Sequence, residues 1–343
     1  MDKPLTKPRI AAFEITRRCP LHCRHCRAAA DPHTQDVLST QDCISILSAL
    51  ASSHRCLVIL TGGEPMERSD FFSILQAGTK AGLRMALAAC GRYLDDSAAR
   101  RLKKEAVLSI SFSLDGADAQ THDDFRASPG AFETVLKAIE TARKAGLTFQ
   151  INTTLTRQNL HEVDRIAHLC EQLGASCWNP FVLVPVGRGE QIQDLLLEGE
   201  EYESLLESLC RIKQHLSIQV RLTCGPQFVR LCRQANLPKA DKVSGCLAGR
   251  DFVFISYRGD VQPCGFLEIS AGNLLERSFD SIWSRSPLFQ SLRQTSNYKG
   301  ACGRCSYLSI CRGCRARAYA VYGDYLQQDP VCLLAQPQRG NRQ

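Results

Sequence analysis

Residues 9–26, RIAAFEITRRCPLHCRHC, join a short apolar segment to three closely spaced cysteines. The first eight of these residues have the composition of a buried strand. Cys19, Cys23 and Cys26 follow in a C-x3-C-x2-C pattern. Three thiolates in one loop can hold a [4Fe–4S] cluster and leave one iron with an open coordination position. A zinc knuckle that adds a nearby histidine is the alternative at this point.

Strand-like and helix-like segments alternate after this loop. Further strands are predicted over residues 56–60, 84–89, 107–114, 147–155 and 176–184. Ser39 with Asp42, and Asn159 with Glu162, resemble capping boxes that begin helices. Residues 131–144 carry one apolar helix face and are followed by Gly146, a typical C-terminal cap. Repeated strand–helix units predict an α/β fold with a parallel sheet, in which the chemistry lies at the carboxyl ends of the strands.

The pattern changes after Gly187-Arg188-Gly189. A helix is predicted over residues 200–216, and a small hairpin over residues 252–263. The chain beyond Cys224 is rich in loops and cysteines, so bound metal would supply its order. We therefore predict a barrel over residues 9–190, a connecting segment over 191–223, a metal-binding domain over 224–335 and a polar tail over 336–343.

The composition narrows the class of protein. The chain has 343 residues, of which 18 are cysteines, and a formal net charge of +7. We find no secretory signal, and the longest uncharged stretch, residues 172–187, is too short for a membrane helix and holds two prolines. We therefore expect a cytoplasmic protein without membrane contact, whose cysteines serve metal or catalysis rather than disulfides. The absence of a basic-aromatic stripe argues against nucleic acid.

A glycine-rich turn follows the second predicted strand. It reads Thr61-Gly62-Gly63-Glu64-Pro65. The two glycines allow close approach of backbone to a ligand, and the carboxylate beside them can accept a hydrogen bond from an ammonium group. Alone, this sequence would suggest an ordinary turn. Together with the cysteine loop one strand earlier, it is a specific signal.

A second set of cysteines lies near the C-terminus. Its members are Cys302, Cys305, Cys311, Cys314 and Cys332, with Cys246 and Cys264 upstream. Two C-x2-C pairs are typical of zinc ribbons. The interval between these pairs is too short for a ribbon hairpin, however, and three further cysteines are available.

The cysteine loop and the Gly-Gly-Glu-Pro turn together resemble the radical S-adenosylmethionine (SAM) enzymes, over about residues 9–184. The resemblance implies a partial (β/α)6 barrel, in which the open iron binds the amino and carboxylate groups of SAM. It implies reductive cleavage of SAM to methionine and a 5′-deoxyadenosyl radical, which abstracts hydrogen from the substrate. The SAM-binding positions that it implies are Gly62, Gly63, Glu64, Ser113, Arg126 and Asn152.

The C-terminal cysteines resemble the SPASM extension of radical SAM enzymes, which holds auxiliary [4Fe–4S] clusters. By that pattern Cys302, Cys305, Cys311 and Cys332 hold one cluster, while Cys246, Cys264 and Cys314 contribute to another. No cysteine lies between Cys246 and Cys264. The second auxiliary cluster is therefore absent, open at one iron, or completed from elsewhere, for example by Cys224. We expect at least one auxiliary cluster.

Four stretches indicate which branch of the radical SAM enzymes the chain resembles. They are residues 13–18, 25–30, 183–189 and 311–332. They resemble the tetrapyrrole-modifying branch, and the Cys-Arg-Ala-Ala exit from the first loop is most similar to the SAM-dependent haem synthases of the siroheme-dependent route. That family oxidatively decarboxylates two propionates of Fe-coproporphyrin III to vinyls, giving haem b. The resemblance implies a low-potential electron donor, such as a ferredoxin or flavodoxin, and the chemistry implies an anaerobic cytoplasm.

Three arginines are candidates for binding the propionates, because arginine pairs with carboxylates bidentately. They are Arg188, Arg315 and Arg317. A solvated basic face that balances cluster charge is an equal alternative for this region.

Other functions stay open on the sequence alone. One is a related tetrapyrrole enzyme, such as a 12,18-didecarboxysiroheme deacetylase, and another is a peptide-modifying maturase. The short segment before the first strand argues against the maturase, which usually carries an N-terminal peptide-recognition domain. A non-catalytic iron–sulfur electron carrier or zinc scaffold would leave the Gly-Gly-Glu-Pro turn and the Ser113–Arg126 region without a purpose.

Overall fold

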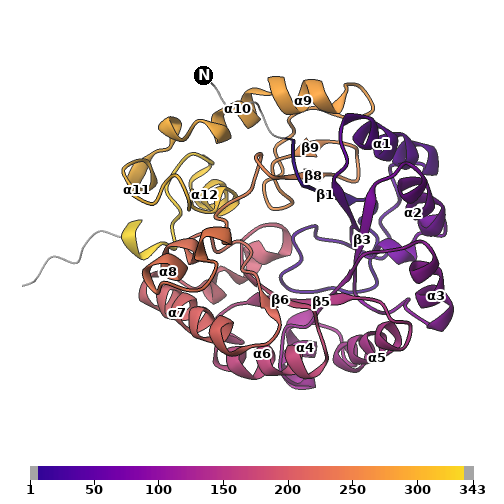
Figure 1. The fold of residues 1–343 in the computed structure, drawn as a ribbon, viewed down its shortest axis with the longest axis horizontal. Coiled ribbons are helices and arrows are strands. Elements are labelled where there is room, and N and C mark those ends of the chain that lie inside the picture. Colours follow the sequence, from indigo (N-terminus) through magenta and orange to yellow (C-terminus); the bar gives the residue numbers. More distant parts are fainter. Residues whose placement is uncertain (1–6, 336–343) are drawn as a thin grey trace, which may run out of the picture.

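The computed structural model describes residues 7–335 and contains one curved sheet (Figure 1). The strands lie in the order β7-β6-β5-β4-β3-β2-β1-β8-β9. Neighbours are parallel except for β8 and β9, which are antiparallel. The strands are β1 (Ile10–Glu14), β2 (Leu57–Thr61), β3 (Arg84–Ala89), β4 (Ile110–Ser113), β5 (Phe149–Leu155), β6 (Cys177–Val182), β7 (Gln219–Val220), β8 (Phe252–Ile255) and β9 (Val261–Gln262). The six predicted strands are confirmed as β1 to β6.

Helices cover the outer face of β1 to β6, as expected for a partial barrel of strand–helix units (Figure 1). They are α1 (Thr40–Ser53), α2 (Phe71–Lys80), α3 (Asp96–Lys104), α4 (Ala119–Arg126), α5 (Ala131–Lys144) and α6 (Val163–Gln172). The helix predicted over residues 200–216 is α7 (Gly199–His215), which packs on α8 (Phe228–Gln234). The predicted capping box at Ser39 and Asp42 is present in full.

The alternation of side chains along β5 explains how the sheet makes both a core and a site. Phe149, Ile151 and Leu155 are buried in the hydrophobic core. Asn152 and Thr154 alternate with these residues and point to the opposite face of the sheet, where they line the interior of the barrel.

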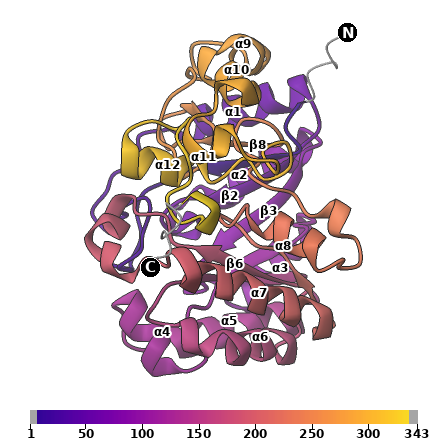
Figure 2. The same cartoon turned by 90° about the vertical axis from the view of Figure 1, so that its left-hand side faces the viewer.

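The predicted hairpin is present, but it does not stand apart from the barrel. β8 pairs in parallel with β1, from Ile10 opposite Phe252 to Phe13 opposite Ile255. The chain beyond Cys224 thus extends the barrel sheet before it forms α9 (Phe279–Arg285), α10 (Pro287–Arg293), α11 (Gly300–Gly303) and α12 (Arg315–Tyr322). Figure 2 shows these helices on the side of the molecule opposite to α4, α5 and α6.

One predicted cap is wrong. The side chain of Asn159 does not cap α6; its amide donates to the carbonyl oxygens of Asp115 and Thr154, and its oxygen accepts from the backbone of Thr156. Glu162 instead accepts from the backbone N–H of Ala117 at 2.9 Å. Both side chains tie α6 to the loop after β4.

Two further predictions concern membrane-spanning helices and the C-terminal tail. Among the described residues no helix is long and apolar enough to cross a bilayer. The predicted tail over residues 336–343 lies outside the part of the chain that the structure describes.

Candidate active site

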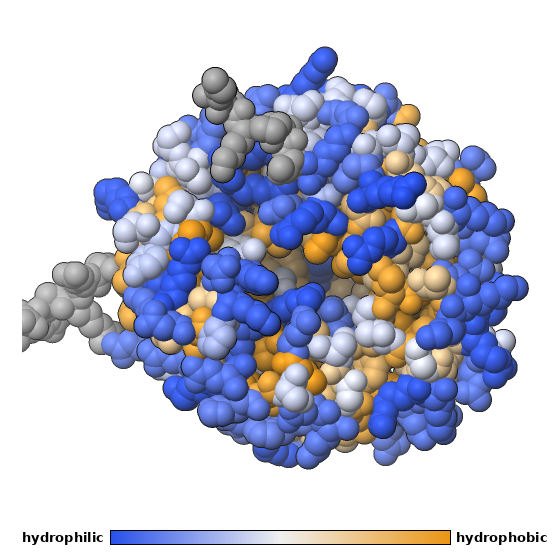
Figure 3. All heavy atoms as spheres, viewed as in Figure 1, coloured by the Kyte–Doolittle hydropathy of each residue, from blue (hydrophilic) through white to orange (hydrophobic). Residues whose placement is uncertain are grey.

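A cavity of about 230 Å³ lies at the carboxyl ends of the barrel strands. It opens on the face shown in Figure 3, which is hollowed near its middle. The predicted residues that line it are Cys19, Cys23, Cys26, Gly62, Gly63, Ser113, Arg126 and Asn152. They come from the loop after β1, the turn after β2, the end of β4, the last residue of α4 and the middle of β5. The fold thus brings the three predicted ligands of the N-terminal cluster to one cavity. Five of the six predicted SAM-binding residues line the same cavity.

Close backbone contacts fix the cysteine loop against β2. The N–H of Gly63 donates to the carbonyl oxygen of Thr16, and that of Glu64 to the carbonyl oxygen of Arg18, both at 2.8 Å. A β carbon at Gly62 would lie 2.4 Å from the Thr16 oxygen, and one at Gly63 would lie 2.3 Å from the Arg18 oxygen. The two glycines are therefore required for the loop to sit beside β2.

Glu64 faces the protein interior rather than the cavity. Its carboxylate is fully buried, and it accepts hydrogen bonds from the backbone of Cys90 at 2.6 Å and of Met66 at 3.0 Å. Burial raises the pKa of Glu64 despite these bonds. In this structure Glu64 thus holds the turn to the end of β3, and binding of a ligand ammonium group by its carboxylate stays a prediction.

Arg188 holds the other side of the loop. Its Nε donates to the carbonyl oxygen of Cys23 at 2.9 Å, and its Nη1 to that of Ala30 at 2.7 Å. The preceding Gly187 has a φ of +57°, and a β carbon there would lie 2.3 Å from the carbonyl oxygen of Arg27. Arg188 therefore positions the cysteine loop, while its Nη2 is buried without a hydrogen-bond partner in the described part of the chain; propionate binding by Arg188 stays a prediction.

Arg126 connects the end of β4 to the cysteine loop. Its guanidinium pairs with Asp115 at 2.6 Å and donates to the sulfur of Cys23 at 3.5 Å. Burial alone would raise the pKa of Asp115, but Arg126 lowers it below its ordinary value. His122 accepts a hydrogen bond from the Asp115 backbone at 3.0 Å, and burial lowers the pKa of His122 to about 4. Arg126 thus places a positive charge beside a predicted cluster ligand, as a negatively charged cluster would require.

The donor set fits an iron–sulfur cluster. Burial raises the pKa of Cys19 to about 12, and also raises the pKa of Cys23 although Arg126 opposes the effect. Both thiols are therefore protonated at neutral pH until a metal displaces their protons. Among the described residues, no three His, Cys, Asp or Glu side chains converge as ligands of a single metal ion. The fit is instead to a wider cluster: three thiols on one loop, an adjacent guanidinium, and the free space of the cavity, whose wall also includes Cys90 after β3.

The C-terminal cysteines form two groups. Cys302, Cys311 and Cys332 lie close enough for charge on one to affect the pKa of another. Cys305 follows one turn after Cys302, its N–H donating to the Cys302 carbonyl oxygen at 3.2 Å. The second group contains Cys246, Cys264 and Cys314, which affect one another in the same way. The assignment of these groups to two auxiliary clusters stays a prediction.

The structure does not support propionate binding by Arg315 and Arg317, whose side chains are buried within the C-terminal region. Arg315 donates to the carbonyl oxygens of Tyr325 and Gln327 and to the sulfur of Cys302 at 3.7 Å. Arg317 pairs with buried Asp329 at 3.1 Å. Their positive charges lie among the cysteines rather than on a solvated face.

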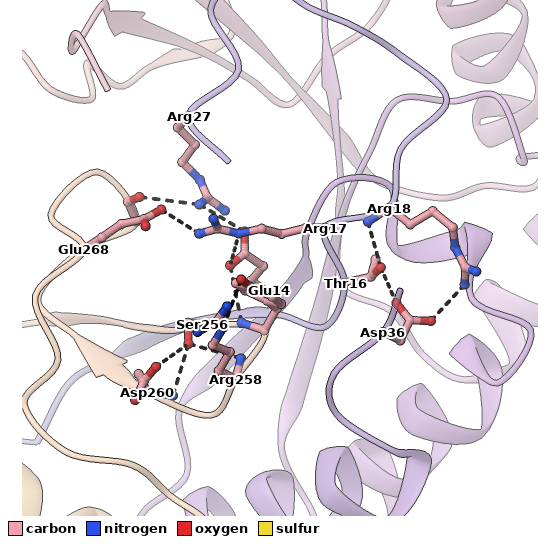
Figure 4. A network of polar contacts seen from close by, with 12 residues as sticks. Glu14, Thr16, Arg17, Arg18, Arg27, Asp36, Ser256, Arg258, Asp260 and Glu268 are labelled. Carbon is pink, nitrogen blue, oxygen red and sulfur yellow. Dashed lines mark hydrogen bonds and ion pairs between the residues drawn. The ribbon is translucent and has the colours of Figure 1, made fainter. Parts of the chain in front are cut away.

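Sequence reasoning missed part of the cavity wall, which includes Arg27, Phe181 and Phe266. The two phenylalanine rings lie 6.5 Å apart between centroids. Arg27 pairs with the buried carboxylate of Glu14 at 3.2 Å and lies 4.4 Å over the ring of Phe254. Figure 4 shows Arg17 and Arg27 gathered around Glu14. The sequence offered one indication that Arg27 lies at the cavity, which is its position directly after Cys26.

Comparisons with known proteins agree with this geometry. The model of the radical SAM superfamily matches residues 13–170, and that of an iron–sulfur cluster-binding domain, SPASM, matches residues 246–315. The AdoMet-dependent heme synthase of Methanosarcina barkeri is 40% identical over 338 residues, which cover 95% of this chain and 96% of that protein. The AdoMet-dependent heme synthase of Nitratidesulfovibrio vulgaris is 39% identical over 337 residues, with 94% and 92% covered.

The fold has solved counterparts. The structure of native anSMEcpe with bound AdoMet and Cp18Cys peptide aligns with a TM-score of 0.77 at 16% identity, covering 96% of this chain and 94% of that one. At this identity the likeness concerns the fold alone. The chain is a radical SAM enzyme, and it belongs to the SPASM-containing family that includes the AdoMet-dependent heme synthases.

Proposed function

We propose that this enzyme converts Fe-coproporphyrin III to haem b by oxidative decarboxylation of two propionates to vinyls. The observation that carries the proposal is the identity of about 40% to AdoMet-dependent heme synthases over nearly the whole chain. Because the alignment includes both the barrel and the C-terminal region, it covers the cavity and both sets of cysteines.

The cavity wall suits an apolar macrocycle that carries carboxylates. Phe181, Phe266 and Val184 supply apolar surface, and Arg27 supplies a positive charge beside it. Within the described contacts only Nη1 of Arg27 is engaged, by Glu14 and the Gly265 carbonyl oxygen. A guanidinium has five N–H donors, so Arg27 retains donors for a propionate. We therefore propose Arg27 as a propionate-binding residue in addition to Arg188, whereas Arg315 and Arg317 are buried away from the cavity.

Cys19, Cys23 and Cys26 would hold the iron–sulfur cluster, which with bound SAM would supply the radical that removes hydrogen from the propionate β-carbon. Loss of carbon dioxide from the resulting substrate radical releases one electron for each vinyl formed. Cys302 and Cys305 belong to a cysteine set that would hold an acceptor or relay for this electron. Replacing both should abolish vinyl product, and unchanged turnover would refute the relay role.

The test is an anaerobic assay of cluster-reconstituted protein with SAM, dithionite and Fe-coproporphyrin III, analysed by mass spectrometry. We expect two successive losses of carbon dioxide with hydrogen, together with 5′-deoxyadenosine. If deoxyadenosine forms while the porphyrin is unchanged, the proposed substrate is wrong, and 12,18-didecarboxysiroheme is the next substrate to test. A ferredoxin or flavodoxin as natural electron donor is tested by replacing dithionite with each reduced protein.

A further inference from the structure

We propose that Glu14, the last residue of β1, is a positioning residue for the substrate. It holds the guanidinium of Arg27 at the cavity wall, where that group meets a carboxylate at the edge of the tetrapyrrole. The inference rests on the proposed function, because it names the side chain that makes Arg27 competent to bind a propionate. Glu14 does not touch the cavity itself and acts only through Arg27.

Glu14 is a fully buried carboxylate that two arginines share. Arg17 lies 3.4 Å from it through Nε, and Arg27 lies 3.2 Å from it through Nη1. Arg17 precedes Cys19, and Arg27 follows Cys26, so the two arginines bracket the cysteine loop. Figure 4 shows both of them beside Glu14. A carboxylate is costly to bury unless it is paired, and here one buried carboxylate fixes both ends of the loop.

The two arginines differ in how many of their donors are used. Arg17 donates through Nε to Glu14 and through Nη2 to Glu268, the latter at 2.6 Å. Arg27 uses only Nη1, which also donates to the Gly265 carbonyl oxygen at 3.4 Å. Within the described part of the chain, Nε and Nη2 of Arg27 have no hydrogen-bond partner and are not buried. Arg27 is therefore held by Glu14 from behind, with donors left for a ligand in the cavity.

The pairing of Glu14 with Arg27 depends on charge more than on directed hydrogen bonds. Oε1 of Glu14, which lies nearest Arg27, is buried and has no hydrogen-bond partner among the described residues. Oε2 accepts from Arg17 at 3.4 Å and from the Tyr257 N–H at 3.3 Å. Charge-assisted N–H···O bonds are normally about 2.7–2.9 Å long. Arg27 can therefore turn towards an incoming carboxylate without losing its counter-ion.

The other side of Arg27 places this charge next to an apolar wall. The guanidinium lies 4.4 Å over the ring of Phe254. A β carbon at Gly265 would lie 3.2 Å from Nε of Arg27 and 3.0 Å from the Phe254 ring, so residue 265 must be small. The next residue is Phe266, which lines the cavity together with Arg27. A flat apolar ring that carries a carboxylate at its edge matches this arrangement.

Glu14→Gln keeps the shape of the side chain and removes its charge. Arg17 and Arg27 then lose their shared counter-ion, and Arg27 is drawn instead towards Asp115, which also lines the cavity. A misplacement of about 1 Å costs about 100-fold in rate, so we expect vinyl formation to fall about 10- to 100-fold. 5′-Deoxyadenosine should still form, because the radical then takes its hydrogen atom from buffer. The ratio of deoxyadenosine to vinyl therefore rises, whereas partial unfolding would lower both products together.

A second measurement is independent of turnover. Titrations followed at the Soret band give Kd for Fe-coproporphyrin III and for its tetramethyl ester, which has no free carboxylates. The wild type should bind the acid more tightly than the ester, and Glu14→Gln should reduce this preference about tenfold, as expected for a charged hydrogen bond. In an Arg27→Gln background, Glu14→Gln should change the preference by less than about twofold, because Glu14 acts through Arg27.

The matched control is Glu268→Gln, which removes the exposed carboxylate that pairs with Arg17 and not with Arg27. Its product ratio and its preference for the acid should stay within about twofold of the wild type, because exposed ion pairs contribute little. Equal changes in the Glu14 and Glu268 variants would overturn the proposal. So would a Glu14→Gln effect that persists in full without Arg27.

Two further outcomes separate this proposal from the proposed function. If the wild type forms no vinyl but prefers the acid to the ester, the proposed function is wrong, and the two titrations still decide the role of Glu14. A wild type without that preference would overturn both. If Glu14→Gln does not retain iron after reconstitution, Glu14→Asp decides, because it keeps the charge and withdraws it from Arg27. It should raise the ratio of deoxyadenosine to vinyl, and an unchanged ratio would refute the positioning role.

Discussion

The two cysteine-rich regions bring thiols together in opposite ways. In the first, Cys19, Cys23 and Cys26 lie on one loop, and backbone contacts with Gly63 and Arg188 fix that loop beside an open cavity. In the second, Cys302, Cys305, Cys311 and Cys314 are close in the sequence, but Cys246, Cys264 and Cys332 join them from separate loops. Cys314 is buried in an apolar group, and the others are partly buried. The comparison teaches that a short local motif is enough for a site that must stay open to a ligand, whereas a closed site depends on the tertiary fold.

The largest expected effect comes from breaking the open region. Cys23→Ala removes a ligand whose sulfur also accepts a hydrogen bond from Arg126. We expect 5′-deoxyadenosine production to fall to background, while the C-terminal clusters stay bound. Chromatography of the reaction products and iron analysis check this together. Deoxyadenosine at the parental rate would show that another site cleaves SAM.

The next effect concerns the substrate side of the same loop. Arg27→Lys keeps the charge beside Glu14 but loses the planar donor set, so we expect kcat/KM for Fe-coproporphyrin III to fall about 10- to 100-fold, the range for a charged hydrogen bond. Steady-state anaerobic assays measure it. The control is Arg24→Lys, an exposed arginine of the same loop whose described side-chain contact is a 3.3 Å hydrogen bond to Gln158. Equal losses in the two variants would refute a specific role for Arg27.

A third prediction concerns acid. The folded-state pKa of His122, about 4, lies below its unfolded value of about 6.5, because burial disfavours the charged ring. At pH values above the unfolded pKa, burial of this neutral ring costs the folded state no stability. As pH falls towards the folded pKa, the ring is protonated in the unfolded state only, and the free energy of unfolding decreases. Between pH 7 and pH 5 we expect the free energy of unfolding of the metal-free protein to fall by about 2 kcal/mol from this group.

Urea unfolding at the two pH values tests this. His122→Gln should reduce the pH dependence by that amount, whereas His168→Gln, at an exposed position of α6, should not. A loss of stability that is the same in the His122 variant and the wild type would assign it to other groups.

The smallest effect lies away from both cysteine regions. Ser39→Ala removes the capping box of α1 and should lower the free energy of unfolding by about 1 kcal/mol. Ser48→Ala, in the exposed middle of the same helix, is the matched control and should change it by a few tenths of a kcal/mol at most. Iron content should not change in either variant, and a loss of iron in the Ser39 variant would contradict the separation of this cap from the sites.

Much of the barrel was predictable because its signals are local. Apolar runs define β1 to β6, and the helix predicted over residues 131–144 matches α5 residue for residue. The cysteine loop and the strand ends carrying Ser113 and Asn152 converge because parallel strands bring their carboxyl ends to one edge.

The errors arose where a distant group decides a side chain's role. Ser39 and Asn159 have similar local patterns, but Asn159 is bound by the backbone of Asp115, 44 residues away. Arg317 is neutralised by Asp329 inside the protein, although its local sequence holds no acid. No local pattern predicts such partners, nor the pairing of β8 with β1.

The most direct test of the account asks which iron responds to SAM. Electron paramagnetic resonance of the reduced wild-type protein, with and without SAM, is compared with the same measurement on the Cys19/Cys23/Cys26→Ala variant. We predict that SAM changes the spectrum of the wild type and leaves that of the variant unchanged, because we expect the iron that binds SAM to belong to the N-terminal cluster. A response to SAM in the variant would contradict the division into one open and one closed region.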